Sequence, residues 1–212
     1  MFARTCSRTA DPVRLAHELV ADGCAVAVED GTGDDAAGFA ELIDRLTADG
    51  LAAHCEVTLD VDRLGASAVR GLAARTPAIA LTGSPDAVDD LAGSLPDARV
   101  VVHAGDPSAE SRCRALASRR VRLVAGRRRS ADLAFVRCLN VLMAADGHPA
   151  VAVSGPRLIA IAGERAAWNG RTPDSWEHVL PYRALTEERR RLLAGGYAVR
   201  VAVGSRRPGG RS

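Results

Sequence analysis

The sequence predicts an α/β protein, specifically a closed (β/α)8 barrel of the TIM type. Short apolar strands rich in β-branched residues alternate with amphipathic helices along the whole chain. The strand-then-helix unit recurs about every 25 residues, which is typical of parallel strands joined by helical crossovers. Eight such strands can be counted, and that number favours a closed barrel over an open, doubly wound sheet.

The first half of the chain contains a leading helix and three of these units. A helix begins at Asp11-Pro12, since Asp is a preferred N-cap and Pro suits the first turn, and it ends at Gly23. The segments that follow are a strand at 24–30, a helix at 34–49 ending at Gly50, a strand at 52–60, a helix near 64–74, a strand at 78–82, and a helix from Ser84-Pro85 to about residue 95.

The second half repeats the pattern, with clearer signals for where each helix begins. A strand at 99–103 precedes a helix that we expect Asp106 to cap, and a strand at 120–124 precedes the longest helix, 130–146, with Ser130 as its N-cap. The remaining segments are a strand at 149–153, a helix at 156–168, a weaker strand at 176–180 interrupted at Pro181, a helix capped by Thr186, and a strand at 197–203.

The segment boundaries predict one domain over residues 1–204 and a basic, flexible tail over 205–212. The sequence has no helical pattern after the eighth strand, so we expect a compact barrel that lacks the last helix. One groove on the barrel wall should then be uncovered, or filled by a protein partner.

Composition excludes several classes of function. All 28 basic residues are arginine, so neither a Schiff-base lysine nor a phosphate-loop lysine is available. The net charge of +2 and the aromatic content of 3% do not favour nucleic-acid binding. Five scattered cysteines without a C-x-x-C pair indicate a reduced, cytoplasmic protein. No apolar run approaches the roughly 18 residues of a membrane span, and no metal-ligand spacing occurs.

In barrels of this type the reactive groups follow the carboxyl ends of the strands. A small anionic ligand could bind there, although solvated loop residues and helix caps would give the same pattern. His103 is the histidine that we favour for a functional role, because it ends a strand. The run Arg127–Arg129 suits either a solvated face or a rim that binds phosphate or carboxylate. The candidate positions are Glu29, Asp30, Asp60, Asp62, Thr82, His103, Asp106, Arg122, Arg127–Arg129, Ser154, Glu177 and His178.

Several stretches resemble the FAD-linked proline dehydrogenases, in the order of that family and over nearly the whole chain. VRLVAG (121–126) is similar to the family motif VRLVKGAY, and HPAVAVSGPRLI (148–159) is similar to a stretch that ends in HDPRLI. The other similar stretches are EVTLDVDRLG (56–65), VVHAGDPSAESRCRAL (101–116), WEHVLPY (176–182) and LTEERRRLLAGGYAVRVAVG (185–204).

The resemblance implies a flavin-binding barrel that oxidises L-proline to 1-pyrroline-5-carboxylate in proline catabolism. It implies that FAD is held by Arg122, Gly126, His103 and Glu177, and that Tyr182 contacts the substrate. No catalytic residue is assigned. Of these five, Arg122, Gly126, Glu177 and Tyr182 keep the family's identity, whereas His103 replaces a glutamine.

Other positions of the family's site also differ. A lysine of the substrate strand is replaced by Asp60, the lysine and tyrosine of KGAY by Ala125 and Arg128, and the glutamine after Glu177 by Val179. The acidic segment at 81–83, the ATH triplet at 152–154 and the last helix with its substrate-binding arginines are also not matched.

Two main hypotheses follow. The chain is either an FAD-dependent proline dehydrogenase or a non-catalytic relative that acts as a binding or partner protein. A third hypothesis is a barrel that binds a phosphorylated metabolite through His103, Arg122 and Arg127–Arg129.

Overall fold

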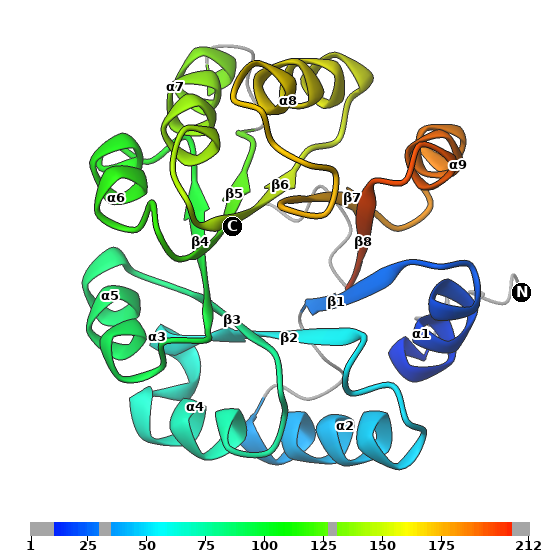
Figure 1. Ribbon diagram of the computed structural model, residues 1–212. Coiled ribbons are helices and arrows are strands. Elements are labelled where there is room, and N and C mark those ends of the chain that lie inside the picture. The colour runs from blue at the N-terminus through cyan, green and yellow to red at the C-terminus, as the bar shows by residue number, and fades with distance from the viewer. Residues whose placement is uncertain (1–10, 30–34, 127–130, 205–212) are drawn as a thin grey trace, which may run out of the picture.

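The computed structural model describes residues 11–29, 35–126 and 131–204, which form a closed barrel of eight parallel strands surrounded by helices (Figure 1). The strands follow one another around the barrel in sequence order, and β8 pairs with β1 to close it. The predicted (β/α)8 barrel is therefore confirmed. The predicted tail at 205–212, Asp30, Arg127–Arg129 and the predicted cap Ser130 lie outside the described residues.

The strands lie close to their predicted positions, and two of them have the predicted bounds. They are β1 (Ala25–Glu29), β2 (Cys55–Asp60), β3 (Ile79–Thr82), β4 (Arg99–His103), β5 (Arg120–Val124), β6 (His148–Ala152), β7 (Glu177–Pro181) and β8 (Ala198–Gly204). Pro181, which was expected to interrupt the seventh strand, is its last residue. Proline is tolerated there because the backbone of β7 needs no further N–H donor at its end.

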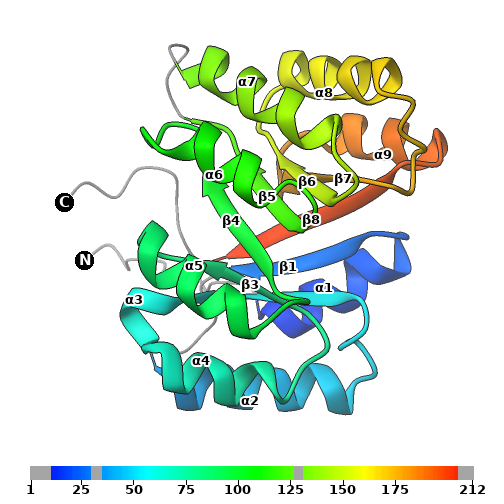
Figure 2. The same cartoon turned by 60° about the vertical axis from the view of Figure 1, so that its left-hand side comes forward.

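The helices lie outside the strands on all sides, as the view along the barrel and the turned view both show (Figures 1 and 2). They are α1 (Pro12–Ala21), α2 (Ala36–Ala48), α3 (Val61–Leu64), α4 (Ala66–Ala73), α5 (Pro85–Ser94), α6 (Ala109–Ala115), α7 (Ala131–Met143), α8 (Pro156–Trp168) and α9 (Thr186–Ala194). Among the described residues, no helix combines the length and the apolar character that a membrane crossing requires.

The groove that was predicted to be open is covered by the first helix. In the described part of the chain no helix follows β8, but α1 packs against both β1 and β8. Val199, Val201 and Val203, which face outward from β8, are all buried. The sharp turn at Gly23, with φ of +84°, lets α1 fold back along β1. The expectation of an uncovered wall was wrong because the helix preceding the barrel fills that place, and binding of a protein partner stays a prediction.

Two predicted helix starts are also corrected. The sixth helix begins at Ala109 with Ser108 at the N-cap, whereas Asp106 lies one turn earlier and accepts a hydrogen bond from Ala109 N through its backbone carbonyl. Thr186 is the first residue of α9 and does not cap it. Leu185, in the left-handed region with φ of 57°, directs the chain into this helix.

Strand side chains alternate between two different environments. Those that face the helices form one continuous apolar core with the helices' inner faces, for example Val26, Leu59 and Leu123. Those that face the barrel axis include most of the buried charged residues of the described chain. The interior is thus chemically unlike the outer core.

His178 lies in the outer core, between β7 and the helices that cover it. Its side chain is 1% exposed, and its ring lies 4.3 Å from the ring of Trp176 and 5.8 Å from that of Tyr197. Neither of its ring nitrogens has a hydrogen-bond partner within the described structure. Burial, and to a lesser degree the charge of Arg191, lowers the pKa of His178 to about 4. The neutral ring is therefore the form compatible with the fold.

The first prediction concerns the effect of this ring on acid stability. The unfolded chain takes up the proton near pH 6.5 and the folded chain only near pH 4, so stability present above 6.5 is lost as the pH falls through this window. The loss amounts to about 3 kcal/mol. Replacing His178 with Phe should abolish this component of the pH dependence, measured by urea unfolding at several pH values. Replacement of the exposed His54 with Asn is the control, and an equal flattening in that variant would contradict the assignment.

Candidate functional site

The strand register arranges the inward-facing side chains in layers, each supplied by alternate strands. Large aliphatic side chains usually fill such layers, whereas this barrel combines alanines with long charged side chains. From the end at which the strands begin, the first layer holds Ala25, Ala78, Arg120 and Glu177; the second Glu56, Arg99, Ala150 and Arg200; the third Ala27, Ala80, Arg122 and Val179; the fourth Thr58, Val101, Ala152 and Ala202.

Glu56 lies at the centre of an ion-pair network in these layers. Arg99 donates from Nε to its Oε2 over 2.7 Å, and Arg122 donates from Nη2 to its Oε1. Burial alone would raise the pKa of Glu56, but Arg99, Arg122 and Arg200 together hold it at about 2. The carboxylate is consequently charged at neutral and mildly acidic pH.

Glu177 extends the network around the barrel. Arg99 donates from Nη2 to its Oε1 over 2.5 Å, and Arg200 donates from Nε to its Oε2 over 3.1 Å. Arg200 also donates to the backbone carbonyl of Val26. Burial opposes the charge on Arg200, yet Glu56 and Glu177 raise its pKa above the usual value. The network therefore joins β1, β2, β4, β5, β7 and β8 across the interior.

Arg122, predicted to bind a cofactor, has both terminal nitrogens of its guanidinium directed at groups of the chain itself, whereas its Nε is buried and has no partner within the described structure. Its Nη1 donates to Glu29 Oε1 over 2.7 Å and to Thr58 Oγ1 over 3.2 Å, in addition to the bond with Glu56. Its side chain is 1% exposed, whereas that of Glu29, at the carboxyl end of β1, is 45% exposed. Glu29 thus covers Arg122 on the side of the barrel mouth.

The structure divides the five predicted site residues into two groups. Arg122 and Glu177 belong to the interior network. His103, Gly126 and Tyr182 lie where β4, β5 and β7 end, with His103 exposed and the other two half-buried. The Tyr182 ring lies 5.4 Å from the guanidinium of Arg183.

Several other candidates have structural roles. Asp60 caps α3 by accepting from Arg63 N over 3.1 Å, and Asp62 accepts from the backbone N and the hydroxyl of Ser84. The capping interpretation holds for Asp60, whereas Asp62 joins α3 to the residue that precedes α5. His178 does not lie at the mouth as expected, because Glu177 faces inward and its neighbour in the strand must face the helices. Thr82, Ser154 and Asp106 lie beyond or at strand ends, half-buried in the first case and exposed in the other two.

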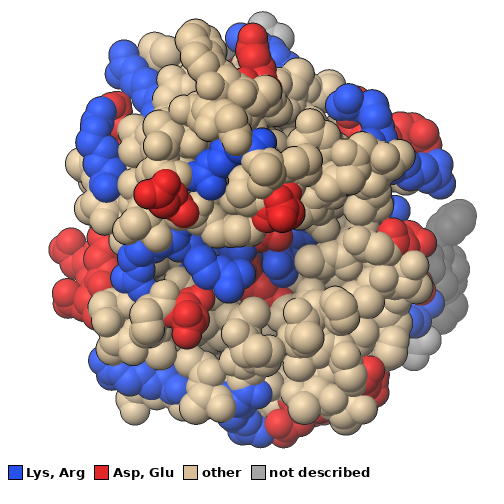
Figure 3. All heavy atoms as spheres, in the orientation of Figure 1, with Lys and Arg blue, Asp and Glu red and all other residues tan. Residues whose placement is uncertain are grey.

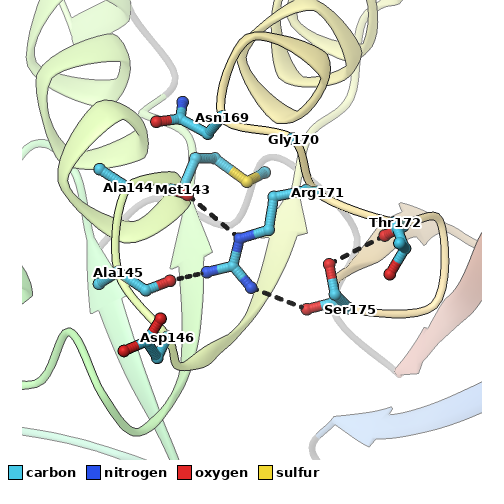
Figure 4. Close-up of a pocket in the computed structure, with 9 residues that line it drawn as sticks. All are labelled: Met143, Ala144, Ala145, Asp146, Asn169, Gly170, Arg171, Thr172 and Ser175. Atoms are coloured by element: carbon cyan, nitrogen blue, oxygen red, sulfur yellow. Dashed lines mark hydrogen bonds between the residues drawn. The ribbon is translucent and has the colours of Figure 1, made fainter.

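Two cavities of about 300 Å³ each lie at the opposite end of the barrel, where the strands begin. Figure 4 shows that Arg171 reaches across one of them toward the end of α7. This arginine donates to the backbone carbonyls of Met143, Ala145 and Gly147. Such carbonyls lack partners within a helix, so the arginine serves as a C-cap and the cavity has a structural explanation.

No group of three or more His, Cys, Asp or Glu side chains within the described ranges could hold a metal ion. Sequence reasoning did not identify the network itself. Its signal was the presence of charged residues at inward positions of strands that are otherwise apolar, such as Arg200 within 197–203 and Arg99 before three valines.

Comparisons with known proteins relate this barrel to a group of solved structures. No protein-family model and no curated protein sequence matches the chain. In contrast, 51 chains of solved structures match. Proline utilization A from Bdellovibrio bacteriovorus, inactivated by N-propargylglycine, has a TM-score of 0.79 at 12% identity, over 91% of this chain and 29% of that one.

Two further matches carry the same name. Proline utilization A from Bradyrhizobium japonicum has a TM-score of 0.66 at 17% identity, and a proline utilization A with proline bound in remote sites has 0.64 at 16%. Each covers 85% of this chain and 26% of the matched one. The chain thus spans less than a third of the length of these proteins, and it shares their barrel fold.

The position of Arg122 and Glu177 does not fit the cofactor role that the sequence resemblance implies. A flavin requires donors directed at its ring and at its pyrophosphate. Arg122 and Glu177 are both buried in ion pairs, and Glu29 lies between Arg122 and solvent. Of the four predicted cofactor residues, His103 and Gly126 alone lie where a ligand at the mouth could reach them.

The second prediction tests the network as a structural unit. Replacing Glu56 with Gln removes the charge shared by Arg99 and Arg122, so that only Glu177 and Glu29 remain to balance three buried arginines. We expect a loss of about 3–5 kcal/mol in the free energy of unfolding, measured with urea at pH 7. Replacing Asp44 with Asn, which breaks the exposed pair with Arg75, should cost no more than about 1 kcal/mol. Similar losses in both variants would show that the interior network contributes no more to the free energy of unfolding than an exposed ion pair does.

Proposed function

We propose that this chain is a proline dehydrogenase-like barrel that acts as a non-catalytic binding protein. The observation that carries the proposal is the internal pairing of Arg122 and Glu177, the two charged residues through which the family resemblance implies flavin binding. The cysteines of the described chain, Cys24, Cys55, Cys113 and Cys138, are free and buried, which supports a reduced, cytoplasmic setting.

The energetic argument concerns the release of Arg122. A ligand that recruited its guanidinium would have to withdraw it from Glu29 and Glu56, and Glu56 is 1% exposed. Breaking a buried pair by removing one partner costs about 3–5 kcal/mol, because the other charge is left uncompensated. Flavin binding would have to supply that free energy in addition to its own ordering cost. Asp60, where the family has a lysine, would further repel a carboxylate substrate at the mouth.

The second candidate function is the family reaction, FAD-dependent oxidation of L-proline to 1-pyrroline-5-carboxylate. The fold shared with proline utilization A supports it, as do Gly126 and Tyr182, which keep the family's identity and lie at the barrel mouth. In this case His103 would contact the flavin in place of a glutamine.

The third prediction separates the two. After incubation with FAD and removal of free cofactor, the purified protein should show no flavin absorbance and no reduction of a dye by proline. The His103→Gln variant, which restores the family's residue at an exposed position, should behave in the same way, because the paired Arg122 remains unavailable. A proline utilization A protein treated identically serves as the positive control.

A protein that retains flavin and oxidises proline would overturn the non-catalytic proposal. Flavin uptake by the His103→Gln variant alone would overturn the argument from the network, since it would show that His103, and not the pairing of Arg122, prevents flavin binding.

A further inference from the structure

The end of the barrel at which the strands begin contains an arginine without a partner. Arg120 belongs to the first interior layer and is half-buried, and no hydrogen bond or ion pair joins it to any part of the chain that the structure describes. Its Nε atom is fully buried. Other interior arginines, Arg99, Arg122 and Arg200, are each paired with a glutamate.

The charges of the interior do not balance. The four interior layers carry four arginines, Arg99, Arg120, Arg122 and Arg200, against two glutamates, Glu56 and Glu177. Glu29 at the mouth adds a third carboxylate by pairing with Arg122, which leaves an excess of one positive charge. Burial, and next the charge of Arg99, lowers the pKa of Arg120 more than Glu56 and Glu177 raise it, so its charge is only partly compensated. A buried charge of this kind is costly unless a counter-ion accompanies it.

The first layer places small side chains near this arginine. Its other three members are Ala25, Ala78 and Glu177, of which the two alanines are half-buried and Ala25 lies across the barrel from Arg120. Glu177 is already paired with Arg99 and Arg200. Figure 3 shows the end of the barrel at which the strands begin, where basic side chains gather at the centre with acidic side chains among and around them. None of the described acidic residues forms an ion pair with Arg120, because Glu56 and Glu177 pair with Arg99, Arg122 and Arg200.

A second polar atom without a partner lies next to this arginine. His148 is the register partner of Arg120 on β6 and is half-buried. Its Nε2 lies 3.2 Å from the carbonyl oxygen of Asp174, whereas its Nδ1 is buried and has no partner in the described structure. Unsatisfied buried polar atoms on two adjacent strands indicate a position that an additional polar group completes.

From these observations we infer that the strand-start end of the barrel is a binding site for a small monocarboxylate, whose carboxylate pairs with Arg120 and whose apolar body lies against Ala25 and Ala78. One carboxylate supplies the single negative charge that the interior lacks. The planar guanidinium matches the two carboxylate oxygens. The site lies at the opposite end of the barrel from the mouth discussed above, so it does not depend on whether flavin binds there.

The fourth prediction tests this site with propionate as the probe. Propionate should raise the melting temperature of the protein in a saturable manner, and calorimetric titration should give a finite affinity. Its uncharged analogue propionamide should have no effect. Replacing Arg120 with Met should weaken propionate binding by about 10- to 100-fold, as expected for loss of a charged hydrogen-bond partner. This variant removes an unpaired charge at similar volume, so it should fold at least as well as the parent.

Two further variants make the result specific. Ala25→Leu enlarges a side chain against which the apolar body of the ligand lies, without changing any charge, and should also abolish propionate binding. Arg114→Met, at an exposed position paired with Glu110, should leave propionate binding intact. Absence of any propionate effect, or equal binding by the Arg120→Met variant, would overturn the site. Inorganic phosphate that stabilised the protein more strongly than propionate would overturn the assignment to monocarboxylates.

Discussion

The pairing of Glu56 and Glu177 with three arginines is the interaction on which this barrel depends. Eight strands close around an axis only if their inward side chains fill the space between them, and alanines alone could not do so. The long side chains of Arg99, Arg122 and Arg200 supply the missing volume, and they are admissible only because carboxylates accompany them. Filling and neutralisation are therefore achieved by the same residues.

Buried ion pairs of this kind contribute more to uniqueness than to net stability. Most of these pairs join strands that are not neighbours, as Arg99 on β4 does by contacting Glu56 on β2 and Glu177 on β7, whereas Arg200 and Glu177 lie on adjacent strands. A slip of one residue in any of these strands would place a charged side chain among the valines and leucines under the helices. Arginine suits the role better than lysine, because it stays charged when buried and presents several donors in a fixed plane.

The sequence predicted the eight strands, their order and the closed barrel, because the alternation of apolar residues and the residues that begin and end helices are local signals. It did not predict what covers β8 and β1, since that depends on the path of α1 after the turn at Gly23. Nor did it predict the interior network. The partners Glu56, Arg99 and Glu177 are distant in sequence, and only the strand register brings them together. Arg122 and Glu177 were singled out by resemblance to a family, but the resemblance could not reveal that they bond to other residues of the chain.

The position of α1 also bears on how the molecule acquires its shape. This helix precedes every strand of the barrel in the chain, yet it packs against β8 as well as β1, and Val26 pairs with the distant Val201 in the sheet. Contacts of such long sequence separation form slowly, because the chain must lose much of its freedom before they are gained. The apolar face of α1 therefore stays partly exposed to solvent until the residues of β8 have been synthesised. Apolar surface that is exposed during this interval favours aggregation of the nascent polypeptide.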